Sequence, residues 1–279
     1  MSPTGGTTMK PRVPTVHRIG QLLSVFTVAR PAWRLHELAR ALDWDMATTH
    51  RLAKALVDIS VLDFDDDGVY RIGLLPVELA AISVSGDPRR RELLRRIEEI
   101  GEESRLTTQI GVLERDAVAI VASHESHSAL RAAAMLGERL PLHATAVGKA
   151  ILTQLDLAQV RRLLPARLPS FAARTITDRS ELLEEVAKAR EEGIAYADSE
   201  LSDGLYAMAI PIPGRYGGTQ PAGLTCAGIS RDLAPEQWSV AERALRKQAA
   251  EFRRSADGPV ATTAPGTSSP TDGGRTDRS

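Results

Sequence analysis

Cysteine is nearly absent from this chain of 279 residues, because Cys226 is its only cysteine. A single cysteine cannot form a disulfide within the chain, and it cannot supply a cysteine-rich zinc site. Cys226 stands mid-strand between Thr225 and Ala227 with no assured histidine partner, which favours a core residue over a nucleophile. We therefore expect a fold without disulfides, in keeping with a reducing compartment.

Long apolar runs and an excess of charge are also lacking. No stretch approaches the roughly 18 apolar residues of a membrane-spanning helix, and the initial sequence MSPTGGTTMKPRVP has no signal-peptide pattern. We therefore expect a cytoplasmic protein without a membrane partner. The formal net charge is -1, so any binding of nucleic acid needs a local basic face and not a polycationic surface.

Changes in composition divide the chain. Hydrophobic residues make up 43% of the sequence, which is enough for two cores, but residues 1–14 and 255–279 have little to bury, and we expect both to be disordered. The sequence SGDP, Ser85 to Pro88, interrupts an apolar helical stretch and places a boundary near Gly86. We assign residues 15–85 to a first domain, 86–104 to a linker helix and 105–254 to a second domain.

The first domain has the pattern of a winged helix-turn-helix. Apolar residues recur at helical spacing in three groups, namely Ile19, Leu22, Leu23 and Phe26, then Leu35, Leu38, Ala39 and Leu42, then Leu52, Ala55, Leu56 and Ile59. Only Asp43 and Trp44 separate the second helix from Asp45, the predicted N-cap of the third, which forces a sharp angle between the two helices. An Asp67-Gly68 turn between two short strands then predicts a β-hairpin.

The third helix has an outward face that can enter the major groove of DNA. Trp44, Thr49 and Leu52 fall on its inner side. The outward positions are Met46, Ala47, Thr48, His50, Arg51 and Lys54. The wing tip is acidic at residues 65–67, so a wing contact with phosphate must come from Arg71, and Arg34 completes the candidate DNA contacts. The alternative is that this face is solvated and the helix-turn-helix mediates protein contacts.

The second domain reads as α+β with a mostly antiparallel sheet. Its strands are expected at 107–113, 117–123, 194–198, 206–213 and 223–229, and its helices at 144–155, 157–164, 178–192 and 236–252. The linker helix carries an apolar stripe, expected to pack on a partner, of Leu93, Leu94, Ile97 and Ile100. A two-fold operator requires a two-fold protein, so we expect at least a dimer.

The stretch LPLHATAVGKAIL, Leu140 to Leu152, raises the question of a phosphate site. It is not a P-loop, because His143 stands where the first glycine belongs and Ala150 where the magnesium-binding hydroxyl belongs. Small residues before Gly148 would let a small carboxylate approach the start of a helix. The alternative is a tightly packed helix that needs Gly148 because a strand crosses it.

Other candidate chemistry is weak. His124 and His127 lack a third metal ligand, so a solvated loop is the better interpretation. Asp198, Glu200 and Asp203 are expected to form an exposed acidic loop and not a catalytic pair of carboxylates, with Glu200 ordering the following turn. We expect no catalytic residue, metal site or cofactor.

The motifs HRIGQLL, LHELARALDWDMATTHRLAKAL, YRIG, LPLHATAVGKAIL, GIAYADSEL and AGLTCAGIS occur in this order between Val13 and Phe252. In these motifs the chain resembles the IclR (isocitrate lyase regulator) family of bacterial transcription factors. The resemblance implies a winged helix-turn-helix that binds double-stranded operator DNA, and a GAF-like effector domain that often assembles into homodimers or homotetramers. Asp43 and Ser60 stand where the family usually has glycine.

The resemblance also implies an effector site in the second domain. The family's ligand-contacting positions correspond to Leu130, Ala146, Val147, Ala197, Ala207, Thr225 and Ala227. Thr225 alone among them is polar, so an aromatic or branched carboxylic acid fits better than a very small polar acid. Two functions result: a transcriptional regulator controlled by a small organic or aromatic acid, or alternatively a GAF-like sensory or catalytic domain whose helix-turn-helix contacts other proteins.

Overall fold

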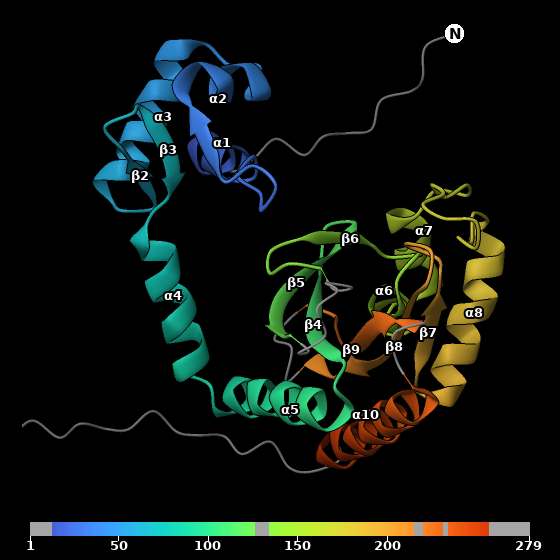
Figure 1. Ribbon diagram of the computed structural model, residues 1–279. Coiled ribbons are helices and arrows are strands. Elements are labelled where there is room, and N and C mark those ends of the chain that lie inside the picture. The colour runs from blue at the N-terminus through green and yellow to red at the C-terminus, as the bar shows by residue number, and fades with distance from the viewer. Residues whose placement is uncertain (1–12, 126–133, 215–219, 231–233, 257–279) are drawn as a thin grey trace, which may run out of the picture.

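The computed structural model describes residues 13–125, 134–214, 220–230 and 234–256 (Figure 1). The two expected disordered ends lie almost entirely outside these ranges. Helix α1 begins at Pro14 and helix α10 extends to Ala256, so each helix takes up one or two residues of the expected ends. No helix within the described ranges is long and apolar enough to cross a membrane.

The first domain confirms the predicted winged helix-turn-helix. It begins with the helices α1 (Pro14–Leu23), α2 (Leu35–Leu42) and α3 (Met46–Asp58), which are followed by the hairpin strands β2 (Leu62–Phe64) and β3 (Val69–Ile72). Strand β1 (Ala32–Arg34) pairs antiparallel with β3 and completes a sheet of order β1-β3-β2. Three residues are too few to show an alternating pattern, so the sequence alone does not predict β1.

Two details of the predicted helices are wrong. Helix α1 ends at Leu23, so Phe26 lies beyond the helix although it still packs against the first core. Helix α3 buries Ala53, whereas Ala55 and Ile59 are exposed. The packing of α3 against α2 and β2, and not its own periodicity, decides which side of the helix faces inward.

Two turns of the first domain use a left-handed backbone without glycine. Asp43 has a φ of 54° at the end of α2, and Ser60 has a φ of 58° before the wing. Asp43 and Ser60 are the two positions at which, according to the resemblance noted above, glycine is usual. Asp tolerates this conformation better than most residues because its short polar side chain bonds locally, so the turn between α2 and α3 keeps its shape.

Two helices follow the wing and lead to the main sheet. Helix α4 (Leu74–Ser85) ends before Gly86, and Asp87 caps helix α5 (Pro88–Ser104) by accepting from the Arg89 N–H at 2.9 Å. The sequence predicts that the apolar stripe of α5 packs on a partner, and this prediction is wrong. Leu93, Ile97 and Ile100 are buried in the core of their own chain, against α10 and one face of the main sheet.

The second domain is built on a six-stranded antiparallel sheet of order β6-β5-β4-β9-β8-β7. Its strands are β4 (Thr107–Glu114), β5 (Ala117–His124), β6 (Arg139–Pro141), β7 (Ala195–Asp198), β8 (Leu205–Ile212) and β9 (Ala222–Ile229). Its remaining helices are α6 (Ala146–Leu152), α7 (Leu157–Leu163), α8 (Arg179–Glu192) and α10 (Pro235–Ala256). The expected strands and helices are all present, with ends shifted by at most four residues.

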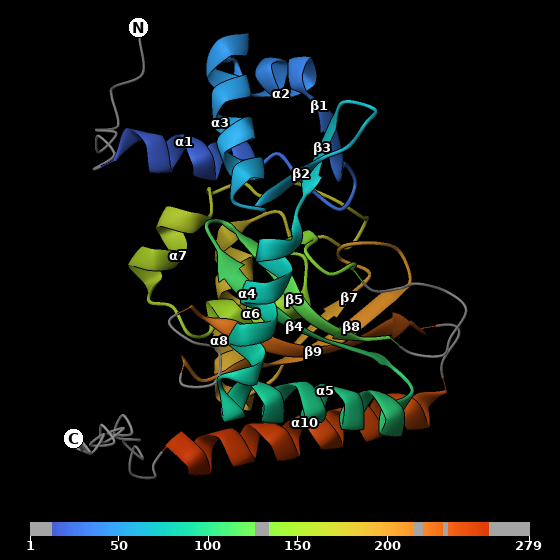
Figure 2. The ribbon, with the colours of Figure 1, turned by 90° about the vertical axis from the view of Figure 1, so that its left-hand side faces the viewer.

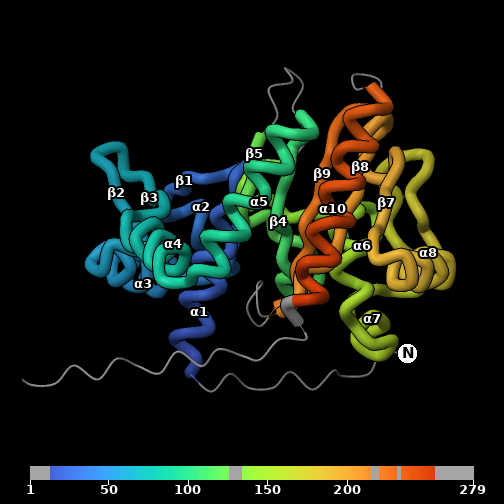
Figure 3. Tube along the Cα trace, turned by 90° about the horizontal axis from the view of Figure 1, so that it is seen from below, coloured from blue at the N-terminus to red at the C-terminus, as the bar shows by residue number. Residues whose placement is uncertain are grey.

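Helices cover both faces of this sheet. Helices α5 and α10 lie side by side along one face, as Figures 2 and 3 show from two directions. Helices α6 and α8 lie on the other face. Neighbouring strand residues therefore enter different cores: on β8, Met208 belongs to the core beneath α5 and α10, while Ala209 belongs to the core around α6.

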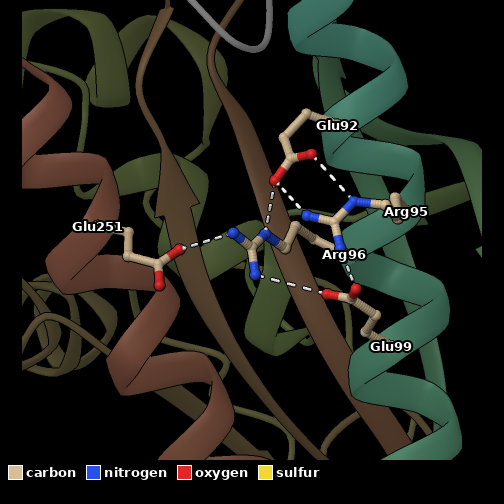
Figure 4. Close-up of polar contacts among 5 residues, drawn as sticks. All are labelled: Glu92, Arg95, Arg96, Glu99 and Glu251. Atoms are coloured by element: carbon tan, nitrogen blue, oxygen red, sulfur yellow. Dashed lines mark hydrogen bonds and ion pairs between the residues drawn. The ribbon is translucent and has the colours of Figure 1, made fainter.

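Charged side chains join α5 to α10 at the solvent edge of their contact (Figure 4). Arg96 lies at the centre, with Nη2 3.3 Å from Glu251 Oε2 on α10 and Nε 2.9 Å from Glu92 Oε1 on α5. Arg95 pairs with Glu92 at 2.6 Å and also with Glu99. Exposed pairs contribute little individually, so the buried apolar stripe supplies most of the stability of this helix pair and the network fixes its register.

Helix α6 is packed unusually closely. All seven of its residues are buried. Gly148 has no room for a side chain, because a Cβ there would lie 2.2 Å from the carbonyl oxygen of Leu142. Two glycines of the sheet, Gly111 on β4 and Gly223 on β9, leave space for the Val147 side chain. The tight-packing interpretation of Gly148 is therefore correct, but the expected crossing strand is wrong, because the neighbour is Leu142 in the chain that leads from β6 into α6.

We predict that Gly148→Ala lowers the free energy of unfolding by about 3 kcal/mol or more, the upper end of the range for overpacking, because its neighbour is backbone and cannot rotate away. Urea denaturation followed by circular dichroism measures this. Gly20→Ala in α1 is the matched control, since nothing lies within 4 Å of its added Cβ, and it should be neutral or slightly stabilising. Equal stability of the two variants would contradict the prediction.

Candidate functional site

The turn between α2 and α3 presents the candidate DNA-binding face. The Asp45 side chain accepts the Thr48 N–H at 2.7 Å, which holds the pKa of Asp45 below its usual value. The Thr49 hydroxyl donates to the Asp45 carbonyl at 2.9 Å, and the Trp44 N–H donates to the Ala39 carbonyl at 2.9 Å. These bonds cap α3 and fix its angle to α2.

The outward face of α3 is free. Met46, Ala47, His50, Arg51 and Lys54 are exposed, and the sixth predicted position, residue 48, is half-buried. Within the described part of the chain, the side chains of His50, Arg51 and Lys54 have neither a hydrogen bond nor an ion pair. Basic groups without an intramolecular partner on one exposed helix face are suited to phosphates and base edges.

The two arginines predicted to contact DNA near the wing have partners within the wing itself. Arg34 Nη1 donates to the Asp67 carbonyl at 2.8 Å. Arg71 Nε lies 3.4 Å from Asp65 Oδ2, while Asp65 Oδ1 accepts the Val69 N–H at 2.9 Å. Both arginines therefore brace the acidic hairpin, an arrangement that the sequence pattern did not indicate.

A cavity of about 280 Å³ lies in the second domain between α6 and the sheet. Six of the seven predicted effector contacts line it, namely Ala146, Val147, Ala197, Ala207, Thr225 and Ala227. The seventh, Leu130, lies outside the described residues. The rest of the described lining comprises Gln109, Ala134, Glu138, Leu140, Ala144, Thr145, Glu200, Leu201, Ser202, Leu205 and Ile229. The lining is predominantly apolar, as is usual for small-molecule sites.

Several polar groups of the lining already donate to the protein. The Gln109 amide donates to the Ser123 hydroxyl at 3.1 Å and to the Ala134 carbonyl at 2.6 Å. The Thr225 hydroxyl donates to the Met208 carbonyl at 3.0 Å, and the Thr145 hydroxyl donates to the Pro141 carbonyl at 2.9 Å. Each of these three side chains therefore faces a ligand mainly as an acceptor.

A buried ion pair lies beside the cavity. Lys149 is 1% exposed, and its Nζ lies 2.7 Å from Glu200 Oε1 and 3.1 Å from the Tyr196 carbonyl. The Thr175 hydroxyl donates to the Glu200 carbonyl at 2.5 Å and holds the loop that carries Glu200. Burial raises the pKa of the Glu200 carboxyl, and the Lys149 ammonium group offsets part of this rise.

Sequence reasoning missed this pair, and the expectation that Glu200 lies in an exposed loop is wrong. Glu200 is 7% exposed. One signal was available: Lys149 interrupts an otherwise apolar helix, and a lysine at a buried helix position requires an acidic partner elsewhere in the chain. Its partner is 51 residues away in sequence, so no local pattern could identify Glu200.

The remaining candidates have structural roles. Cys226 is fully buried on the opposite side of β9 from Thr225 and Ala227, and burial raises the pKa of its thiol to about 12, which confirms a core residue. His124 Nε2 lies 3.2 Å from Glu102, and His127 lies outside the described residues. Among the residues that the structure describes, no cluster of His, Cys, Asp and Glu side chains is suited to hold a metal ion.

A winged helix-turn-helix with a free basic face, joined to a domain with an internal apolar cavity, defines the class of ligand-responsive DNA-binding regulators. Comparison with known families agrees. Residues 15–66 match the IclR helix-turn-helix domain, and residues 82–252 match the family described as bacterial transcriptional regulator IclR C-terminal. The chain belongs to the IclR family of bacterial transcriptional regulators.

Characterised relatives and solved structures are similar over most of their length. The regulator XynR of Escherichia coli is 27% identical, over 72% of this chain and 81% of its own. BhcR of Paracoccus denitrificans is 29% identical over 78% of each chain. The crystal structure of an IclR-type regulator from Silicibacter has a TM-score of 0.77 at 25% identity and covers 88% of this chain and 97% of its own.

One solved neighbour contains a ligand. An IclR homologue from Microbacterium hydrocarbonoxydans, complexed with 4-hydroxybenzoate, has a TM-score of 0.73 at 24% identity and covers 86% of this chain and 99% of its own. At this identity the likeness concerns the fold. The family match establishes an IclR-type transcriptional regulator with a DNA-binding and an effector-binding domain, and it does not favour the alternative of a helix-turn-helix used for protein contacts.

Proposed function

We propose that this regulator binds two-fold operator DNA in the cytoplasm through the outward face of α3, and that a small organic acid in the cavity of the second domain controls this binding. The observation that carries the proposal is the free basic face of His50, Arg51 and Lys54 on a capped helix. The wing contributes less, because Arg34 and Arg71 are engaged with its own acidic residues.

We further propose that the DNA-binding domain comprises residues 15–85, the linker helix 86–104 and the effector domain 105–254. The break between α4 and α5 at Gly86 supports the first boundary. The burial of α5 against α10 supports a linker helix that moves with the effector domain. In this arrangement α4 connects the wing to the linker helix α5, so a shift of the effector domain would change the orientation of the DNA-binding domain through α4.

The effector class follows from the size and lining of the cavity. Alanine at positions 146, 197, 207 and 227 leaves room for an apolar body, and the few polar groups suit one or two polar ends. An aromatic or branched carboxylic acid supplies such a body, and its acid group would take donors from backbone N–H groups or the Ser202 hydroxyl, because the side chains of Gln109, Thr145 and Thr225 face the cavity as acceptors. The 4-hydroxybenzoate held by a neighbour of the same fold makes the benzoates a natural first panel of probes.

The DNA contacts are testable by two single substitutions. Arg51→Ala should weaken operator binding by about 1 to 3 kcal/mol and relax sequence preference, because an arginine near base edges contributes to direct readout. Lys54→Ala should weaken binding to all sequences alike and reduce the salt dependence, as expected for a phosphate contact. Fluorescence anisotropy at several salt concentrations, with operator and scrambled DNA, measures both effects.

Lys188→Ala is the control for the charge change, since Lys188 is exposed on α8 in the other domain. It should leave operator affinity unchanged. An Arg51→Ala variant with full affinity and selectivity would refute the assignment of the α3 face.

The cavity is testable by filling it. Ala146 is fully buried and lines the cavity, so Ala146→Leu should occupy the space of the ligand body and abolish the response to acids. DNA binding without acid should survive, because the α3 face lies in the other domain. Thermal shift and calorimetry against benzoates and branched acids measure the response. Ala187→Leu, on the exposed side of α8, is the matched control.

If no acid changes the melting temperature of the parent protein, the effector class is wrong. If Ala146→Leu responds to a bound acid as the parent does, the cavity is not the effector site.

We propose a homodimer, or a homotetramer built from dimers, with α4 in the dimer contact. Helix α4 is apolar on all sides, yet none of its residues is buried: Leu74, Val77, Leu79 and Ile82 are 62%, 61%, 55% and 66% exposed. A helix with apolar residues all round requires cover. The stripe of α5, first assigned to this role, is already buried in its own chain.

Sedimentation at micromolar concentration should give a dimer or tetramer, and Val77→Glu with Ile82→Glu should shift it toward the monomer with weaker operator binding. Leu157→Glu is the control, because Leu157 is 49% exposed on α7, away from α4. A parent protein that is monomeric and still binds the operator tightly would contradict the assignment.

A further inference from the structure

The strongest unexplained feature of the effector cavity is one oxygen atom of Glu200. Its Oε1 is bonded to Lys149 Nζ at 2.7 Å, but its Oε2 is buried and has no hydrogen-bond partner among the described residues. Buried carboxylate oxygens without a partner are rare because the loss of water is not compensated. Glu200 lines the cavity and Lys149 does not, so Glu200 is the member of the ion pair that lies next to the cavity.

We propose that the cavity selects effectors that carry a hydrogen-bond donor on their apolar body, a hydroxyl or a protonated amino group, and that Glu200 Oε2 accepts from this donor. The inference rests on the proposed effector function and narrows its ligand class to hydroxy- or amino-substituted acids. Glu200 is then a specificity-determining residue, and its pairing with Lys149 Nζ at 2.7 Å holds the carboxyl group in position.

The other polar groups of the lining support this assignment. The donors of Gln109, Thr145 and Thr225 are bonded to other groups, so none of these side chains donates to Glu200 Oε2. The described lining also contains a second carboxylate, Glu138, and no lysine or arginine. The described lining therefore offers acceptors to a donor group of the ligand, and Glu200 contributes a buried oxygen that still lacks a partner.

Matched benzoates in pairs of equal size test the proposal. The hydroxybenzoates and the methylbenzoates, each as meta and para isomers, differ in one donor but little in volume. The para-aminomethyl analogue carries a charged group that can donate and cannot accept. Calorimetry on the full-length protein should give at least one donor-bearing isomer that binds about tenfold or more tightly than its methyl counterpart.

Glu200→Gln keeps a carbonyl oxygen for Lys149 but replaces Oε2 with an N–H donor, so it should remove the tenfold preference. The loss should be clearest for the aminomethyl analogue, which then faces another donor. Glu185→Gln is the matched control. It changes a carboxylate 3.9 Å from Lys149 Nζ that does not line the cavity, and the preference should persist.

If Glu200→Gln does not fold, as judged by circular dichroism and by operator binding without acid, the double variant Lys149→Met with Glu200→Gln removes the buried charge as well. It should bind methylbenzoates as tightly as hydroxybenzoates. Equal affinities of donor-bearing and methyl acids in the parent protein, or a preference that survives in the Glu200 variants, would overturn the inference and leave the effector function intact. A panel without any binding would overturn both.

Discussion

Helix α6 lies inside the effector domain with every residue buried, and the rest of that domain is arranged around it. Its distance from the chain that precedes it is set by Gly148, and its distance from the sheet by Gly111 and Gly223. Because interiors are close-packed, the position of α6 also sets the size of the cavity beside it. One short helix thus decides both the stability of the domain and the space for an effector.

The charge of Lys149 is a second constraint on the same helix. An ammonium group at this depth requires a carboxylate, and Glu200 meets the requirement from the loop after β7. That loop also forms one wall of the cavity. Glu200 therefore belongs both to the buried ion pair and to the cavity lining, and a change at this residue alters both.

The DNA-binding domain obeys more local rules. Asp45 caps α3 by accepting the N–H of Thr48, three residues away, and the left-handed backbone of Asp43 turns the chain between the helices. The helix-turn-helix therefore depends on interactions between residues close in sequence. Its wing differs from a plain basic hairpin because Arg34 and Arg71 are held by acidic neighbours. Within the described part of this domain, His50, Arg51 and Lys54 lie free on α3, and exposed large apolar residues gather on α4.

Local pattern alone determined the winged helix-turn-helix, the antiparallel sheet, the helix that ends at Gly193 and the side of β9 that carries Thr225, because capping, turn chemistry and strand alternation act over a few residues. Tertiary structure decided the inward side of α3, the burial of the α5 stripe in its own chain and the partner of Lys149. These depend on segments brought together by the fold, and Glu200 is 51 residues from Lys149. The residues next to Lys149 or Glu200 in sequence do not reveal this contact, because packing and charge compensation depend on distance in space and not on distance along the chain.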